Sequence, residues 1–284
     1  MAATLERPTG SLEDGVIPID GFVAPTRLDG ADREQVLALA TDRPLLEIQG
    51  LQAGYGRMEI LHGIDLAVAK GQSLCLIGPN GAGKSTVLHA IFGFADIFAG
   101  RISLGQGEAT EDVTRLQPNQ KLKDARIGYV MQHPSVFPEM TVEENLVMGG
   151  YALASPRKAK AAAERVLGAY PRLAARRRNR AETLSGGERR LLEIGRALVM
   201  EPEVLLVDEP SIGLEPRFIE MVFELLGELQ TVHGKTIIMV EQNAKKGLEF
   251  ADLGYVLVAG ELAMAGRGAD LLADPRVGRL FLGG

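Results

Sequence analysis

Residues 78–86 read Gly-Pro-Asn-Gly-Ala-Gly-Lys-Ser-Thr and directly follow the apolar run Leu74–Ile77. This order predicts a buried strand, a glycine-rich loop and then a helix from Val87 to Phe92. A loop of the form Gly-x4-Gly-Lys-Ser between a strand and a helix is typical of sites that hold a nucleoside triphosphate. A simple glycine-rich turn would not require all three parts. The predicted nucleotide-binding residues of the loop are Gly78, Pro79, Asn80, Gly81, Ala82, Gly83, Lys84, Ser85 and Thr86.

Each residue type in this loop suits the binding of phosphate or of Mg²⁺ for a chemical reason. The glycines allow consecutive backbone N–H groups to turn toward phosphate oxygens, and the helix that follows adds the positive end of its dipole. Lys84 supplies a point charge for the outer phosphates. The hydroxyl of Ser85 is a hard oxygen ligand, which suits Mg²⁺.

Composition and charge limit the other functions of the chain. It has 284 residues, a net charge of −6 and one cysteine, Cys75. The acidic charge disfavours a nucleic-acid binder, and a single cysteine excludes an internal disulfide and fits a reducing compartment. The first ten residues lack the pattern of a secretory signal, and no apolar run is long enough to span a membrane. Any membrane role is therefore expected to come through a partner.

Residues 1–44 differ in composition from the rest of the chain. They are rich in acidic residues and are interrupted by Pro8, Pro18, Pro25 and Pro44. We expect a mostly flexible extension in which only Arg33–Ala40 looks helical. A partner-docking arm is the alternative.

From residue 45 to 284 strands and helices alternate. Expected strands are Leu45–Leu51, Ile64–Val68, Ser73–Ile77, Arg101–Leu104, Arg126–Met131, Val204–Val207 and Thr236–Val240. Expected helices are Val142–Leu146, Lys158–Leu167, Ala174–Arg178, Gly187–Met200 and Arg217–Val232. This alternation predicts an α/β fold with a mainly parallel sheet that is covered on both faces.

Two adjacent carboxylates follow a buried strand. Val204–Val207 is fully apolar and leads into Asp208 and Glu209. Charges at the carboxyl edge of a sheet are costly without a cation, and ligands bind at this edge in α/β proteins. We expect Asp208 to hold hydrated Mg²⁺ and Glu209 to orient and polarise an attacking water.

Leu184-Ser185-Gly186-Gly187-Glu188 precedes the expected helix Gly187–Met200. Ser185 and Glu188 have the spacing of a capping box, so the segment could be only a well-capped helix start. The double glycine favours a binding function beyond capping, because exposed backbone N–H groups, a serine hydroxyl and a helix dipole together form a second anion site.

These motifs, in this order and with Gln132 between them, resemble the ATP-binding cassette (ABC) ATPases of membrane transporters. The resemblance covers residues 45–284. It implies a P-loop NTPase with a RecA-like core, an antiparallel β subdomain and an inserted helical subdomain at about 133–183. It also implies that two cassettes pair head to tail, either as a homodimer or with a sister subunit.

The resemblance assigns further roles. Ser185, Gly186, Gly187 and Glu188 would form the signature that contacts ATP bound to the partner cassette. Tyr55 matches the aromatic residue that stacks on adenine, although a turn tyrosine is the simpler interpretation. Gln132 matches the residue that reaches Mg²⁺ and the attacking water. Gln242 replaces the usual switch histidine, so it can donate a hydrogen bond but cannot become cationic.

Less specific motifs indicate the class of transporter. Residues 136–146, 240–243 and 280–284 resemble cassettes that energise uptake of branched-chain amino acids, or their urea and amide relatives. This implies transmembrane permease subunits, indirectly a solute-binding protein, and a location at the cytoplasmic face of the cell membrane. Export of lipid or lipopolysaccharide is an alternative, and a soluble non-transport cassette ATPase is an alternative of another class.

A basic cluster lies just before the signature. It consists of Arg172, Arg176, Arg177, Arg178 and Arg180. A solvated helical face is the simpler interpretation. Docking on an acidic permease loop or on anionic headgroups is the alternative.

Overall fold

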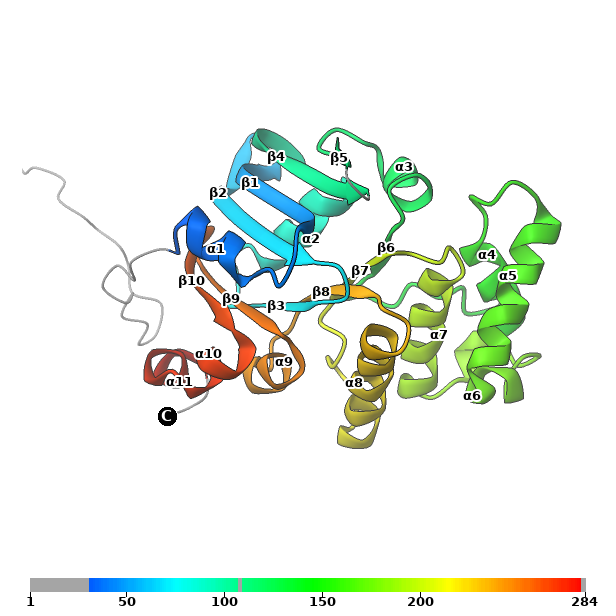
Figure 1. Cartoon of the computed structure of the whole chain (residues 1–284). Helices are drawn as coiled ribbons and strands as arrows, with labels where there is room; N and C mark the ends of the chain where they lie inside the picture. The colour runs from blue at the N-terminus through cyan, green and yellow to red at the C-terminus, as the bar shows by residue number, and fades with distance from the viewer. Residues whose placement is uncertain (1–30, 107–108, 282–284) are drawn as a thin grey trace, which may run out of the picture.

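The strand before the glycine-rich loop lies in the middle of a six-stranded sheet (Figure 1). All neighbouring pairs are parallel except the edge pair β10 and β9. The computed structural model describes residues 31–106 and 109–281, without side-chain detail at 106, 280 and 281. The prediction of a mainly parallel sheet is confirmed. The strand order is β10 (Glu261–Arg267), β9 (Leu253–Val258), β3 (Ser73–Ile77), β8 (Thr236–Val240), β7 (Val204–Asp208), β6 (Ile127–Val130).

Both faces of the inner strands of this sheet are buried. Cys75 and Ile77 of β3 belong to the apolar core shared with α7, α8 and α9, whereas Leu74 and Leu76 belong to the core shared with α2. Successive side chains of a strand point to opposite faces, so an unbroken apolar strand requires cover on both sides. These helices are α2 (Lys84–Phe92), α7 (Gly186–Leu198), α8 (Pro216–Thr231) and α9 (Ala244–Phe250).

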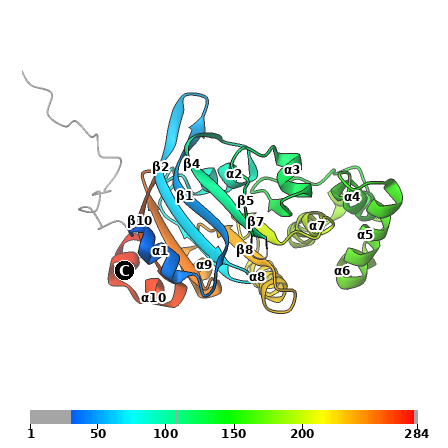
Figure 2. The same cartoon turned by 45° about the horizontal axis from the view of Figure 1, so that its top comes forward.

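A second, antiparallel sheet lies over α2, which packs against both sheets (Figure 2). Its strands are longer than the sequence predicts, and β1 continues beyond Leu51 through register shifts near Gly50. The order is β2 (Met58–Ala69), β1 (Pro44–Tyr55), β4 (Asp96–Gln106) and β5 (Ala109–Asp112). Helix α3 (Pro118–Lys123) connects this sheet to β6.

A group of helices extends beyond α7 at one end of the molecule (Figure 1). The expected helix Ala174–Arg178 is wrong in position. Pro171 occupies the first turn of α6, where its missing N–H costs nothing, and Arg176 already ends the helix at φ −102° and ψ 6°. The elements are α4 (Val142–Gly149), α5 (Pro156–Ala169), α6 (Pro171–Ala175) and the 3₁₀ helix η1 (Ala181–Thr183).

Helix α1 (Arg33–Leu39) packs against β2 and β10. Its Val36 is buried in the core that α2 shares with both sheets, and Asp32 caps its N-terminus. The helix expected within the extension is therefore attached to the folded body, whereas residues 1–30 lie outside the described residues. The division of the chain at residue 44 stays a prediction.

Two short helices, α10 (Gly268–Ala273) and α11 (Pro275–Phe281), follow β10. The motif at 280–284 lies mostly outside the described residues. Each helix in the described part of the chain is too short or too polar to cross a membrane.

Candidate active site

The glycine-rich loop is closely packed at both of its ends, after β3 and before α2. A Cβ atom at Gly78 would lie 2.2 Å from the carbonyl oxygen of Leu257, and one at Gly83 would lie 2.7 Å from Cδ2 of Leu61. Gly83 is also the N-cap of α2 and has a φ of 94°, which side-chain-bearing residues rarely adopt. Helix α2 begins at Lys84, three residues earlier than predicted, so its first N–H groups lie inside the loop.

Lys84 curves back over this loop. Its Nζ donates to the carbonyl oxygens of Gly78 at 2.8 Å and of Pro79 at 3.0 Å. Burial lowers the pKa of Lys84, while the charges of Glu209 and Asp208 act in the opposite direction. A cavity of about 280 Å³ opens at this point. It is lined by Ile60, Asn80, Gly81, Ala82, Gly83, Lys84, Ser85, Thr86 and Glu209.

Asp208 is held from two sides at the end of β7. It is 2% exposed, its Oδ1 accepts from the Ser85 hydroxyl at 3.0 Å, and its Oδ2 accepts from the Tyr129 hydroxyl at 3.1 Å. Two of the three residues predicted to hold a metal, Ser85 and Asp208, are therefore adjacent. Tyr129 was not recognised in the sequence, although its position on the strand that pairs with β7 is compatible with this contact. Burial and the charge of Asp208 raise the pKa of Tyr129.

Glu209 has a strained backbone and a fixed side chain. Its φ is 43°, in the left-handed region. The side-chain amide of Gln132 donates to Glu209 Oε2 at 2.7 Å. The structure thus brings together the two residues predicted to act on the attacking water.

The start of α7 has the predicted capping box. Glu188 N–H donates to Ser185 Oγ at 3.3 Å, and Ser185 N–H donates to Glu188 Oε2 at 2.9 Å. A Cβ at Gly187 would lie 2.1 Å from the Phe218 ring, whereas one at Gly186 would meet only Leu214 at 3.6 Å. Packing within the chain therefore explains the glycine at 187 but not the one at 186. None of residues 185–188 lines the cavity at the phosphate loop.

Tyr55 ends β1 and has a partner that the sequence did not reveal. Tyr55 is 43% exposed, and its hydroxyl oxygen lies 2.5 Å from Nδ1 of His89 on α2. The His89 ring also makes edge contacts with Phe94 and Tyr129. Burial lowers the pKa of His89, which favours the neutral ring that can accept from Tyr55.

Gln242 follows β8 and is exposed, and its side chain makes no hydrogen bond to any residue in the described ranges. Among the described residues, the structure therefore shows no hydrogen bond between Gln242 and Glu209. Its neighbour Glu241 is buried instead, and Glu241 Oε1 accepts from the Ser211 hydroxyl at 2.7 Å and from Asn243 N–H at 2.9 Å. Burial raises the pKa of Glu241.

The basic cluster before the signature is partly neutralised within the chain. Arg176 pairs with Glu188 at 3.0 Å, and Arg177 pairs with both Glu143 and Glu164. These contacts favour a solvated face stabilised by ion pairs over a free basic surface.

Comparison with known proteins matches this arrangement. The ABC transporter family model matches residues 61–212. The high-affinity branched-chain amino acid transport ATP-binding protein BraG of Pseudomonas aeruginosa is 40% identical over 240 residues, which cover 84% of this chain and 100% of BraG. The lipopolysaccharide export system ATP-binding protein LptB of Acidithiobacillus ferridurans is 32% identical over 240 residues, which cover 84% of this chain and 97% of LptB.

A solved structure is similar over its whole length. The crystal structure of an ATP-binding cassette of an ABC transporter in its ADP conformation matches with a TM-score of 0.74 at 29% identity, covering 86% of this chain and 100% of that one. The predicted α/β cassette fold is confirmed. The chain belongs to the ABC transporter family and is an ATP-hydrolysing cassette of an ABC transporter.

Proposed function

We propose that this ATPase energises the uptake of branched-chain amino acids. The observation that carries the proposal is the 40% identity to BraG along the whole of that protein, compared with 32% for the lipopolysaccharide export protein LptB. Uptake of urea or amides and export of lipopolysaccharide are the alternatives within the family.

The phosphates of ATP would lie in the cavity at the glycine-rich loop. The N–H groups at the start of α2 and the ammonium of Lys84 face this space with positive charge. Tyr55, fixed at its hydroxyl by His89, has an exposed ring that could stack on adenine.

The side chains beside this cavity fit a bound Mg²⁺. The hydroxyl of Ser85, the carboxylate of Asp208 and the amide oxygen of Gln132 are all hard oxygen donors. Mg²⁺ is commonly bound by one or two carboxylates together with waters and substrate phosphates, and this set matches that requirement. When bound, the ion would neutralise charge that develops on the phosphates.

Hydrolysis would depend on Glu209 and Gln132. Glu209 Oε2 already accepts from the amide of Gln132, which leaves its other oxygen, Oε1, to accept a proton or hydrogen bond from a water. A carboxylate fixed in this way orients the water for attack on the γ-phosphate and polarises it. Lys84 would stabilise the charge on the phosphates as the bond breaks.

Partners would complete the cycle. The signature at Ser185–Gly187 would contact ATP bound to a second cassette, either another copy of the chain or a sister subunit. Closing and reopening of the pair would drive permease subunits in the membrane, at its cytoplasmic face, and a solute-binding protein would deliver the solute.

The two signature glycines are expected to respond differently to alanine. Gly187→Ala forces a methyl group into the Phe218 ring, so it should cost about 1–3 kcal/mol of stability and lower Tm by several degrees. Gly186→Ala has room within the chain and should keep Tm. It should nevertheless lower turnover by about tenfold or more, because the added methyl group would hinder the close approach of the partner's phosphate to the backbone N–H.

Thermal unfolding and steady-state ATP hydrolysis on both purified variants test this difference. Turnover of Gly186→Ala at the wild-type rate would contradict the proposed phosphate contact. An unchanged Tm for Gly187→Ala would contradict the packing explanation.

Deletion of the gene tests the solute. Uptake of labelled leucine should fall to background, while uptake of labelled urea and the surface level of lipopolysaccharide should stay unchanged. Loss of urea uptake alone would assign the chain to the amide branch, and loss of surface lipopolysaccharide alone would assign it to export.

A further inference from the structure

Arg190 contacts the ends of two strands from within α7. Its Nη1 donates to the carbonyl oxygen of Met131 at 2.8 Å, and its Nη2 donates to the carbonyl oxygen of Asp208 at 2.9 Å. The same side chain forms an ion pair with Glu193 at 3.0 Å, and the two residues are 5% and 6% exposed. One buried guanidinium therefore connects α7 to the ends of β6 and β7.

The two carbonyl groups precede the two proposed catalytic side chains. Met131 is followed by Gln132, and Asp208 is followed by Glu209. Gln132 and Glu209 are themselves joined by the 2.7 Å hydrogen bond between their side chains. A shift in either peptide unit would therefore change the geometry of this pair.

The peptide unit between Asp208 and Glu209 is fixed from both sides. Its C=O accepts from Arg190, and its N–H donates to the carbonyl oxygen of Val240 at 2.9 Å. These bonds hold Glu209 at a φ of 43°, a conformation that persists only where surrounding contacts enforce it. Without Arg190 this peptide unit would lose one of its two bonds.

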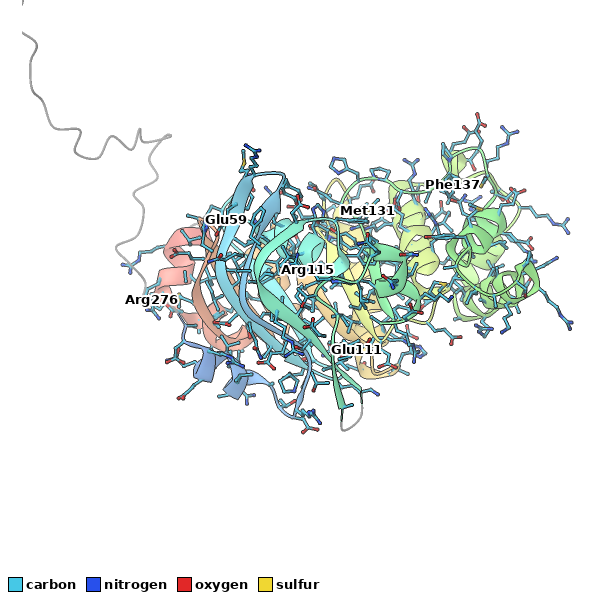
Figure 3. All side chains as sticks on the ribbon, turned by 90° about the horizontal axis from the view of Figure 1, so that it is seen from above. Glu59, Glu111, Arg115, Met131, Phe137 and Arg276 are labelled. Atoms are coloured by element: carbon cyan, nitrogen blue, oxygen red, sulfur yellow. The ribbon has the colours of Figure 1, made fainter. Side chains whose placement is uncertain are left out.

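Other side chains of α7 hold the segment after Gln132. Glu193 Oε1 accepts from Ser135 N–H at 3.1 Å, and Arg196 donates to the Ser135 carbonyl oxygen. The Arg196 guanidinium also lies 5.0 Å from the centre of the Phe137 ring. Figure 3 labels Met131, which precedes Gln132, and Phe137, which lies in this segment, as seen from above.

We propose that Arg190, with Glu193 as its buried counter-ion, is a positioning residue that sets Gln132 and Glu209 in their catalytic geometry. Because α7 begins at the signature, the same contacts couple a displacement of the signature helix to these two residues. The inference rests on the proposed roles of Gln132 and Glu209. It adds a structural connection, within one chain, between the signature and the catalytic residues Gln132 and Glu209.

A purely structural role for Arg190 and Glu193 predicts a different result from a positioning role. A buried ion pair can often be replaced by apolar residues of similar volume without loss of stability. If Arg190 and Glu193 served only packing, a double substitution to methionine would preserve both the fold and the activity. If they position the catalytic pair, the same variant keeps the fold and loses turnover.

The test is therefore Arg190→Met with Glu193→Met in the full-length chain. We expect ATP affinity within about twofold of wild type and kcat lower by about ten- to hundredfold, since small displacements of catalytic groups cost this much. Arg165→Met, which removes an exposed ion pair to Glu201, is the control and should leave kcat unchanged. Wild-type kcat in the double variant would overturn the inference.

Two further measurements separate the possible failures. In a Glu209→Gln background the double substitution should add almost no further loss of kcat, and an additive loss would overturn positioning through Glu209. If Glu209→Gln alone keeps wild-type turnover, the proposed catalytic assignment fails and the inference fails with it. If the double variant does not fold, Arg190→Lys decides, because one ammonium keeps the charge but lacks the two-pronged guanidinium, and kcat should still fall.

Discussion

Lys84→Ala is expected to weaken ATP binding by about 10- to 100-fold. The substitution removes a charge-assisted contact to the phosphates, and such contacts contribute about 1.5–3 kcal/mol. The loop loses the hydrogen bonds that Lys84 donates to Gly78 and Pro79, but the close packing of Gly78 against Leu257 and of Gly83 against Leu61 should preserve its shape. Titration of the purified chain with a fluorescent ATP analogue measures the change.

Lys123→Ala is the matched control for this substitution. Lys123 is exposed on α3 and does not line the cavity at the phosphate loop, so its removal should leave nucleotide affinity unchanged. Unaltered affinity in Lys84→Ala would contradict the assignment of Lys84 to the phosphates.

Glu209→Gln is expected to lower steady-state hydrolysis by about 10²- to 10⁴-fold while ATP affinity stays within about twofold. Glutamine has nearly the same shape, so it can keep the hydrogen bond with Gln132 and the backbone bonds that fix residue 209. It cannot act as a base toward the attacking water. The loss should therefore appear in kcat and not in binding.

Phosphate release and nucleotide titration on the same preparation check both halves of this expectation. Glu224→Gln, an exposed carboxylate on the neighbouring helix α8, should behave like wild type. A drop in affinity as large as the drop in turnover would indicate damage to the phosphate loop instead of loss of a base.

The parts of the site that the sequence predicts are those encoded by adjacent residues. The glycine-rich loop, the capping box at Ser185 and the carboxylates after β7 each have a local physical reason, and their positions at strand and helix ends are confirmed. The sequence predicts a strand at Leu45–Leu51, whereas β1 runs from Pro44 to Tyr55 and continues through register shifts near Gly50 that the apolar pattern does not reveal.

The contacts that the sequence does not predict join residues far apart in the chain. The fold brings the His89 ring to the Tyr55 hydroxyl and the Tyr129 hydroxyl to Asp208. It also brings the Arg190 guanidinium to the Asp208 carbonyl oxygen. In the sequence, Arg190 resembles an ordinary solvent-exposed arginine on a helix. Its burial beside Glu193 in the structure shows that it is not exposed. Helix ends such as that of α6 depend on a single proline and on neighbouring turns.

Uptake of labelled leucine by cells that carry Glu209→Gln in place of the native residue tests the central claim most directly. The claim is that hydrolysis at this site powers amino acid import. Uptake should fall to the level of the gene deletion, and cells that carry Glu224→Gln should take up leucine at the wild-type rate. Wild-type leucine uptake in the Glu209→Gln cells, with the variant protein present at its normal level, would contradict the account.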